Sequence, residues 1–348
     1  MKEGTTVNRI YLLGFIFTVL VIAVHAGNLY LIPEALRQGA AYDAAELLES
    51  FIGEELGQIA VPGFFFISGY LFCRSLGGEK ITVGDIKRKW KNRLISLVLP
   101  YAIWNLIYYV IYLVFGRAEA SPRAALDAIV FYGYNPVFWY MQQLIILSVL
   151  APFLYAVLRD SGRKSAIFLL FLFFVVAANT NTVSVHIVNE DALFYYCCGI
   201  VAVTFYDELF ESEGRDLHRN LMCIGIFLFI MLGFVMTVPG VMGDSLALYT
   251  GAIVLRRISG VLAVWLLLCC FRLGKGEPAG WMKITFFIYA THYLVIRALN
   301  FIVPKNAVLL LILYLVMPAI CVAAAYGGFL MLKRFIPGLC RMLCGGRS

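Results

Sequence analysis

Residues 61–72 read VPGFFFISGYLF, a stretch in which Ser68 and Gly69 interrupt a run of aromatic rings. The stretch lies inside an apolar segment long enough to cross a bilayer, which takes about 20 residues. A hydroxyl and a bare glycine add little to a surface that contacts only lipid. They suit a place where another helix, or a flat acyl or sugar group, comes close to the backbone. We therefore expect a membrane segment with a function beyond anchoring.

Apolar segments of this length recur along the chain of 348 residues, of which 62% are hydrophobic and 14% charged. Soluble proteins carry about 25% charged residues, so the sequence predicts an all-α membrane protein with about ten transmembrane helices in one bundle. The remaining loops are too short for a separate globular domain, and we expect a single domain over residues 1–348. The expected spans are 9–26, 57–77, 94–116, 136–158, 165–182, 192–210, 220–240, 247–271, 283–303 and 307–332.

The longest connections are 27–56, which is acidic, and 78–93, which is basic. From Asp43 to Leu56 apolar residues recur at helical spacing, which predicts a short helix at the membrane interface. If the N-terminus is cytoplasmic, 21 of the 28 lysines and arginines lie on the cytoplasmic side and five on the other. This bias predicts a multi-pass protein of the cell membrane with both termini in the cytoplasm.

The net charge of +7 follows from this topology and from attraction to anionic headgroups. Membrane lipid is therefore an expected partner and nucleic acid is not. The sequence has no HExxH, GxSxG, Walker or Rossmann pattern, and these motifs mark metal, serine-hydrolase and nucleotide sites. We expect neither a metal nor a bound cofactor. No signal indicates a particular oligomeric state.

Two histidines lie inside predicted spans. His25 follows Arg9 by 16 residues, about 24 Å along a helix, and His292 lies near the middle of the ninth span. An imidazole in hydrocarbon is costly unless it is satisfied, and it is suited to taking a proton from a hydroxyl near neutral pH. Function is our preferred reading for His25. For His292, structural hydrogen bonding between helices is an equal alternative.

Three arginines are candidate binding residues. Arg256 and Arg257 are adjacent within the eighth predicted span, where guanidinium groups must be paired or face water. They could bind a phosphate or pyrophosphate of a lipid-linked sugar or of coenzyme A, or could extend toward the headgroups. Arg93 ends a basic run that begins at Lys87. That run could attract the phosphates of an acyl-CoA, and the positive-inside bias requires it equally.

Four segments together resemble the integral-membrane acyltransferase 3 family. VPGFFFISGYLF (61–72) is similar to the FFxxSG signature on the second span of that family. The other three are a basic stretch before a proline-containing third span, an aromatic span ending in proline and a late FxIYxxH segment. They correspond to IKRKWKNRLISLVLPYAIW (86–104), FWYMQQLIILSVLAPFLY (138–155) and FFIYATHYLVI (286–296). The matches follow the order of the family, and the ordered set is more specific than any one segment.

The resemblance implies transfer of an acyl group, commonly acetyl from cytoplasmic acetyl-CoA, to a hydroxyl of a cell-surface or lipid-linked carbohydrate. Acyl-CoA is then a donor substrate and the glycan an acceptor, as in O-acetylation of a cell-envelope polysaccharide. The family carries arginine, ten residues and then histidine on its first span. His25 matches the histidine, and Gly14 stands at the arginine position. Either Arg256 or Arg257 supplies the missing cation, or the chain has diverged in activity.

The resulting hypothesis makes His25 the general base, with His292 relaying a proton or orienting the donor and Ser68 donating a hydrogen bond. The acyl donor would contact further residues, namely Phe64, Phe65, Gly69, Arg93, Trp139, Arg256 and Arg257. Two alternatives remain open at this point. One is a non-enzymatic transporter or flippase of a lipid-linked sugar that uses the same arginines and aromatic rings. The other is a catalytically inactive member of the family.

Overall fold

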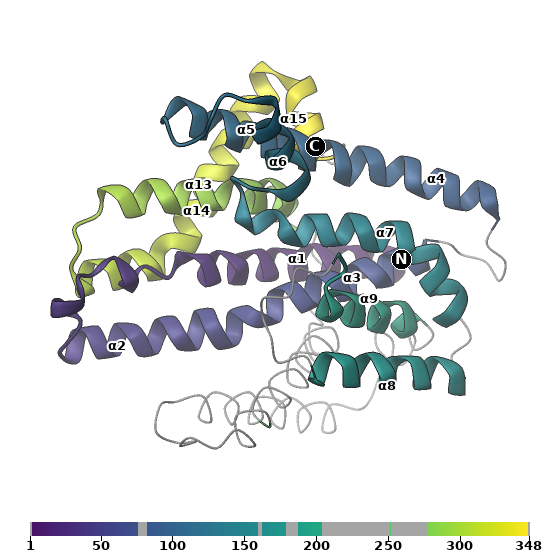
Figure 1. The fold of residues 1–348 in the computed structure, drawn as a ribbon. Helices are drawn as coiled ribbons and strands as arrows, with labels where there is room; N and C mark the ends of the chain where they lie inside the picture. The colour runs from purple at the N-terminus through teal and green to yellow at the C-terminus, as the bar shows by residue number, and fades with distance from the viewer. Residues whose placement is uncertain are drawn as a thin grey trace.

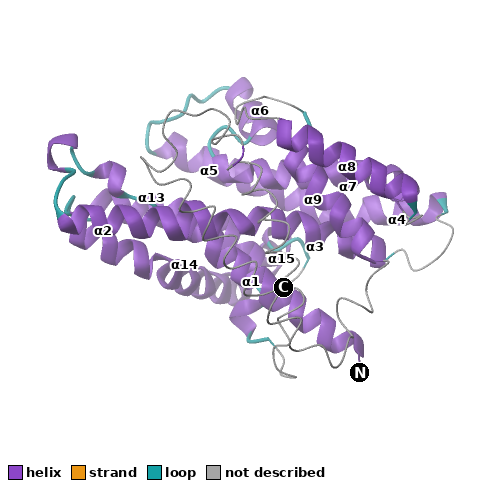
Figure 2. Ribbon diagram, turned by 90° about the horizontal axis from the view of Figure 1, so that it is seen from below, coloured by secondary structure: helices purple, strands orange, loops and turns teal. Residues whose placement is uncertain are grey.

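The computed structural model describes residues 2–75, 82–158, 162–178, 187–203, 251 and 278–346. All regular elements in these ranges are helical (Figure 2). The α-helices are α1 (Lys2–Ala26), α2 (Ala40–Glu49), α3 (Ala60–Arg74), α4 (Val83–Arg93), α5 (Leu99–Val114), α6 (Pro122–Phe131), α7 (Trp139–Leu158), α8 (Arg163–Ala178), α9 (Glu190–Ala202), α13 (Thr285–Ile302), α14 (Ala307–Phe335) and α15 (Pro337–Leu343).

Six helical segments in the described residues are long and apolar enough to cross a membrane. They are Ile10–Leu31, Ala40–Arg74, Val83–Val114, Pro136–Leu158, Thr285–Ile302 and Ala307–Phe335. Each overlaps one of the ten expected spans, although the second and third segments begin well before the expected spans 57–77 and 94–116. The expected span 165–182 corresponds to α8, which has 16 described residues, and 192–210 is described only as far as residue 203. The expected spans 220–240 and 247–271 lie outside the described residues, apart from residue 251.

The expected short interfacial helix over residues 43–56 is not a separate element. Instead, α2 continues through a π-helical turn (Ser50–Leu56) and a 3-10 turn (Gly57–Ile59) into α3, which gives one segment of 35 residues (Figure 1). The separate helix is therefore a wrong expectation. Small residues let this segment lie against α1, because a Cβ on Gly57 would overlap the Val24 side chain. The segment reaches the Ala26 end of α1, the end that carries His25.

A second π-helical turn joins α4 to α5. A capping box starts α4: Thr82 Oγ1 accepts from the Asp85 amide at 3.2 Å, and an Asp85 carboxylate oxygen accepts from the Thr82 amide at 3.2 Å. The basic stretch is thus helical and runs through Leu94–Val98 into α5. Pro100 is tolerated because it falls in the first turn of α5. This continuity places Arg93 at the junction between the exposed helix α4 and the buried part of α5.

One hydrophobic core includes residues from Leu13 to Cys344. Helix α1 crosses its centre, in contact with α3, α13 and α14 (Figure 1). The chain end also belongs to this core, since Trp104 Nε1 of α5 donates a hydrogen bond to the Leu343 carbonyl oxygen at 3.1 Å. Cys340 of α15 and Cys344, which directly follows this helix, are also buried. The C-terminal segment is therefore part of the packed structure that supports α5.

Helices α3 and α9 form the most extensive pairing in the described residues. A Cβ on Gly69 would overlap the Tyr196 carbonyl oxygen, and a Cβ on Gly199 would overlap the Phe66 carbonyl oxygen. The two glycines therefore bring the helix backbones into direct contact, as small residues do in membrane bundles. Of the two close neighbours that the sequence suggested for Gly69, a helix or a flat ligand, the structure shows a helix.

Candidate active site

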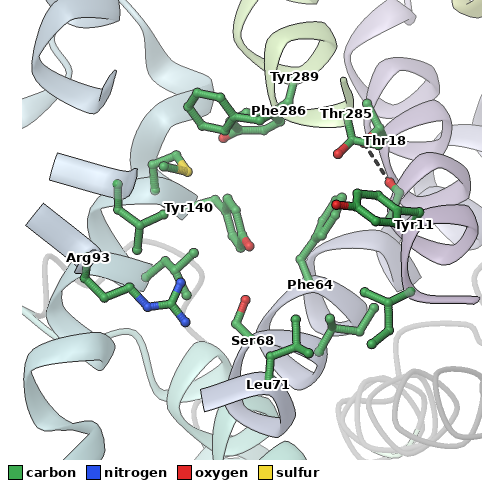
Figure 3. A pocket seen from close by; sticks show the side chains of 16 residues that line it. Tyr11, Thr18, Phe64, Ser68, Leu71, Arg93, Tyr140, Thr285, Phe286 and Tyr289 are labelled. Atoms are coloured by element: carbon green, nitrogen blue, oxygen red, sulfur yellow. Dashed lines mark hydrogen bonds between the residues drawn. The ribbon is translucent and has the colours of Figure 1, made fainter. Parts of the chain in front are cut away.

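A cavity of about 360 Å³ lies between α1, α3, α7 and α13, with the π-helical turn before α5 on one side (Figure 3). It opens among mostly apolar side chains. Its walls are formed by Ile10, Tyr11, Gly14, Thr18, Phe64, Ile67, Ser68, Leu71, Arg93, Leu97, Tyr140, Met141, Leu144, Thr285, Phe286 and Tyr289. Its volume falls in the range of small-molecule sites.

A few polar groups face this largely apolar space, which is the usual composition of a ligand pocket. Of the lining residues, only Arg93 is charged. Its guanidinium group enters from the α4–α5 junction, on the opposite side of the cavity from Tyr11 (Figure 3). Ser68 presents its hydroxyl from α3, and Tyr140 presents its hydroxyl from α7. The cavity can therefore bind an apolar arm carrying a few polar or negatively charged atoms.

Gly14 forms part of the cavity wall on α1. The nearest atom to a Cβ built at this position is Thr285 Cγ2, at 4.0 Å. One turn further along the helix, Thr18 donates its hydroxyl hydrogen to the Gly14 carbonyl oxygen at 2.7 Å. The bare glycine leaves open space in the wall, so the cavity is wider here than it would be with a side chain.

The two membrane histidines face each other across the α1–α13 contact. Their ring centroids are 5.5 Å apart, and the ring planes are inclined by 38°. His25 is partly exposed, whereas His292 has no exposed surface. The structure thus brings together two residues that are 267 positions apart in the sequence. Of the two residues, only His25 has surface that a substrate can reach.

The hydrogen bonding of His292 defines which nitrogen is free. Its Nδ1 contacts the carbonyl oxygen of Tyr289. Because a carbonyl oxygen can only accept, Nδ1 carries the hydrogen, and Nε2 of the neutral ring is an acceptor. Nε2 is buried and has no hydrogen-bond partner among the described residues. A buried acceptor of this kind gains stability from any donor brought to it, and the neighbouring His25 ring is the nearest imidazole.

The contact between α1 and α13 connects the cavity to the histidine pair, and we call this contact the seam. On α1, Thr18 lines the cavity and His25 follows seven residues later, about 10.5 Å along the helix and on nearly the same face. On α13, Tyr289 lines the cavity and His292 follows three residues later. The histidines are not themselves among the lining residues. They lie at the far end of the same interface.

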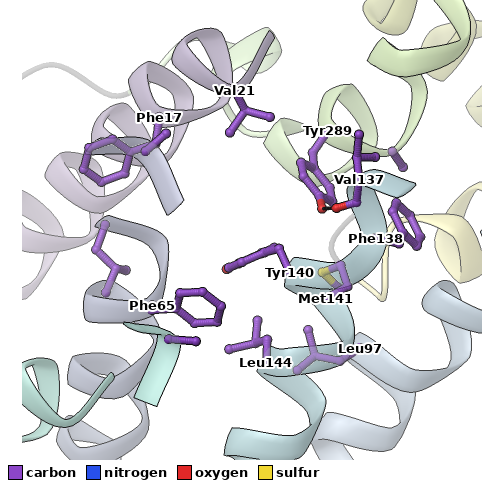
Figure 4. Packing of buried hydrophobic residues seen from close by; sticks show 14 of the residues in the cluster. Phe17, Val21, Phe65, Leu97, Val137, Phe138, Tyr140, Met141, Leu144 and Tyr289 are labelled. Carbon is purple, nitrogen blue, oxygen red and sulfur yellow. Dashed lines mark hydrogen bonds between the residues drawn. The ribbon is translucent and has the colours of Figure 1, made fainter. Parts of the chain in front are cut away.

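Tyr289 forms the wall between the cavity and His292. Its hydroxyl donates to the Val137 carbonyl oxygen, and its ring stacks on Phe138 with centroids 5.7 Å apart and planes inclined by only 8° (Figure 4). The His292 ring lies 5.7 Å from the ring of Tyr289 on the same helix. Packing and hydrogen bonding therefore fix Tyr289 in a single orientation. A ligand that extends from the cavity toward the histidines must pass beside its ring.

The structure separates the remaining candidate residues into three groups. Phe64 lines the cavity together with Ser68 and Arg93. Phe65 and Trp139 do not line it: the Phe65 ring packs 4.8 Å from Tyr140 and 6.4 Å from Trp139 and so supports the wall from behind. Gly69 likewise faces α9 instead of the cavity. Arg256 and Arg257 lie outside the described residues.

Several cavity and seam residues were not singled out from the sequence, above all Tyr140, Tyr289 and Tyr293. Tyr140 follows Trp139 directly, and Tyr289 and Tyr293 flank His292 within FFIYATHYLVI. The segments were therefore recognised, but the roles of their tyrosines were not. A helical projection of residues 285–293 would have placed Thr285, Tyr289 and His292 on one face.

Comparison with known proteins identifies the family of this multi-pass membrane protein. The family model of the acyltransferase 3 domain matches residues 9–327, and the chain belongs to this family. The match covers α1 to most of α14 and includes every described residue of the cavity and the histidine pair. No curated protein and no solved structure matches the chain. Family membership makes the protein a multi-pass membrane acyltransferase.

Proposed function

We propose that the protein transfers an acetyl group from acetyl-CoA to a hydroxyl of a cell-surface or lipid-linked carbohydrate, with His25 as the general base. The observation that carries this proposal is the partly exposed His25 ring 5.5 Å from the buried ring of His292, at the end of a seam that begins in a ligand-sized cavity. Catalysis by a base requires an accessible imidazole whose other nitrogen is held in place. His25 meets the first condition, and His292 can meet the second.

The donor would occupy the cavity from the side of α4. Arg93 lines the cavity, and Lys87, Lys89 and Lys91 precede it on the same helix. Guanidinium and ammonium groups bind phosphates strongly. The nucleotide end of acetyl-CoA would therefore remain at the basic helix, while the apolar pantetheine arm follows the cavity between Phe64 and Tyr140. Ser68 would donate a hydrogen bond to the arm.

The chemical step then needs only the histidines and the two substrates. His25 removes the proton from the acceptor hydroxyl as its oxygen attacks the thioester carbonyl carbon. A new carbon–oxygen bond forms, the carbon–sulfur bond breaks and coenzyme A leaves as its thiolate, which takes up the proton from His25. His292 Nε2 would accept a hydrogen bond from the second nitrogen of His25 and so stabilise the imidazolium. His292 is a positioning residue in this scheme.

The proposed topology places both termini in the cytoplasm. The distribution of lysine and arginine supports it, and the basic helix α4 then faces the cytoplasmic pool of acetyl-CoA. The Ala26 end of α1, with His25 near it, points to the opposite side of the membrane. Acceptor and donor would thus reach the histidine pair from opposite sides.

The test uses full-length protein in lipid nanodiscs with radiolabelled acetyl-CoA and the glycan fraction of the host envelope. We expect label in the glycan and release of free coenzyme A. His25→Gln should lower the rate by about 10²–10⁴-fold at unchanged membrane abundance. Full activity in His25→Gln would show that His25 is not the general base. Movement of lipid-linked sugar without consumption of thioester would favour a transporter, and neither activity would favour an inactive member of the family.

A further inference from the structure

Tyrosine side chains gather close to His25, and one of them, Tyr293, contacts its ring. Tyr293 directly follows His292 on α13, and its ring lies 6.2 Å from the His25 ring in an edge-to-face arrangement with an interplanar angle of 80°. His292 is completely buried, but Tyr293 is partly exposed. Tyr293 is therefore placed to contact a molecule that approaches His25 from the surface.

Other elements bring further tyrosines to the same place. Tyr30 and Tyr112 lie in the neighbourhood of Tyr293. Tyr112 of α5 packs in turn against Tyr134, with ring centroids 5.3 Å apart. Tyr30 belongs to the short turn after α1 and is 60% exposed. These four residues, Tyr30, Tyr112, Tyr134 and Tyr293, come from four separate segments, and we call them the tyrosine group.

Arg297 adds a cation to the tyrosine group. It lies one turn beyond Tyr293 on α13, and the centre of its guanidinium group is 5.9 Å from the centre of the Tyr293 ring. The side chain is exposed and forms no ion pair among the described residues. A guanidinium group held against an aromatic ring is fixed in direction and keeps N–H donors available for oxygen atoms.

Tyrosines also gather at membrane interfaces, where they form belts facing the headgroups. A belt distributes its rings around the perimeter of a protein. Tyr293 of the tyrosine group instead contacts the His25 ring inside the bundle. A position beside an ionisable residue explains this contact, whereas anchoring to lipid does not.

We propose that the tyrosine group and Arg297 form the acceptor subsite, in which a sugar ring packs its C–H face on Tyr293 while Arg297 donates hydrogen bonds to its oxygen atoms. Sugar rings combine an apolar face with a polar edge, and a tyrosine beside an arginine offers the complementary surfaces. The subsite holds the acceptor hydroxyl against His25 from the side opposite to the cavity. The inference rests on the proposed transfer to a carbohydrate and identifies where the carbohydrate binds.

The experiment measures sugar binding without acetyl-CoA, so it does not depend on acyl transfer. Full-length protein in phosphatidylcholine nanodiscs is titrated with the methyl glycosides of glucose, galactose and N-acetylglucosamine, and contact is detected by saturation-transfer NMR. We expect at least one glycoside to bind. Tyr293→Ala and the bulkier Tyr293→Leu should weaken its binding about tenfold, whereas Tyr293→Phe should retain it because the ring is kept.

Arg297→Ala should weaken binding of the same glycoside. Arg334→Ala is the matched control because Arg334 also lies over an aromatic ring, 5.8 Å from Phe335. Tyr42→Ala is the control for loss of a tyrosine elsewhere. Absence of binding by all three glycosides, or equal affinity in the wild type, Tyr293→Ala and Tyr293→Leu, would overturn the subsite. If the protein transfers acetyl groups but its glycoside affinity is unchanged by the Tyr293 variants, the subsite is overturned and the proposed reaction stands. Tyrosine-dependent binding without any acetyl transfer would retain the subsite and remove the proposed reaction.

Discussion

Gly69 of α3 and Gly199 of α9 lie back to back, so that each helix backbone occupies the space where the other would carry a side chain. A Cβ at either glycine would overlap a carbonyl oxygen of the other helix. A carbonyl oxygen cannot move aside as a flexible side chain can. The cavity residue Ser68 directly precedes Gly69, and Phe64 lies one turn earlier on the same helix. The direction of α3, and with it one wall of the cavity, therefore depends on this contact.

Replacing Gly69 with alanine should destabilise the protein. The added methyl group cannot be accommodated without separating α3 from α9, and overpacking of this kind costs roughly 1–3 kcal/mol. We expect a lower midpoint of thermal unfolding in detergent and a loss of acyltransferase activity. Gly327→Ala on α14 is the matched control, because nothing lies within 4 Å of a Cβ there. Equal stability of the two variants would contradict direct backbone contact at Gly69.

Gly14 should control the capacity of the cavity. The methyl group of Gly14→Ala would make only ordinary van der Waals contact with Thr285, so we expect little effect. A phenylalanine at position 14 would fill space in the wall and should raise the KM for acetyl-CoA by about tenfold or more, with unchanged thermal stability. Initial rates at varied donor concentration measure this. An unaltered KM in Gly14→Phe would show that the donor does not use this cavity.

Arg93 should contribute to donor binding through charge. Loss of a charge-assisted hydrogen bond costs about 1.5–3 kcal/mol, so Arg93→Ala should raise the KM for acetyl-CoA about tenfold or more. High salt should reduce the difference between wild type and variant. Arg88→Ala is a suitable control because Arg88 is exposed and pairs with Asp85 at 2.7 Å, and such surface pairs contribute little. Parallel effects in both variants would indicate general attraction by α4 instead of a specific contact.

His292 should affect the rate of the chemical step without affecting binding of the donor. His292→Leu removes the acceptor nitrogen next to His25 while keeping an apolar side chain of similar size. We expect kcat to fall at least tenfold and the dissociation constant for coenzyme A to stay within about twofold, since the cavity lies beyond Tyr289. A fall in coenzyme A affinity with normal kcat would instead assign His292 to the donor site. Thermal unfolding of the variant serves as the folding control.

The sequence was sufficient to predict the helical membrane fold of the described residues. Apolar segments of span length have no stable alternative to helix in a bilayer, which is why the six described spans fall where they were expected. The continuity of α2 with α3 was missed because polar residues such as Glu54 and Glu55 suggested an interface. Packing of Gly53 and Gly57 against α1 keeps that stretch in the bundle instead.

The site was only partly predictable. His25 and His292 stood out as ionisable groups in apolar segments, but their proximity depends on how α1 crosses α13. Conversely, Phe65 and Gly69 belong to a recognisable motif, yet they face Tyr140 and α9. A motif identifies the helix, whereas the rotation of that helix within the bundle decides which of its residues reach the ligand. That rotation is set by contacts between segments distant in sequence.

The hydrogen bond from Trp104 to the Leu343 carbonyl oxygen has a consequence for biosynthesis. Helix α5 is translated well before this partner, because Leu343 follows Trp104 by 239 residues. The wall beside Leu97 and Arg93 therefore lacks this support until Leu343 has been added, and a nascent chain halted before that residue would hold α5 without its partner.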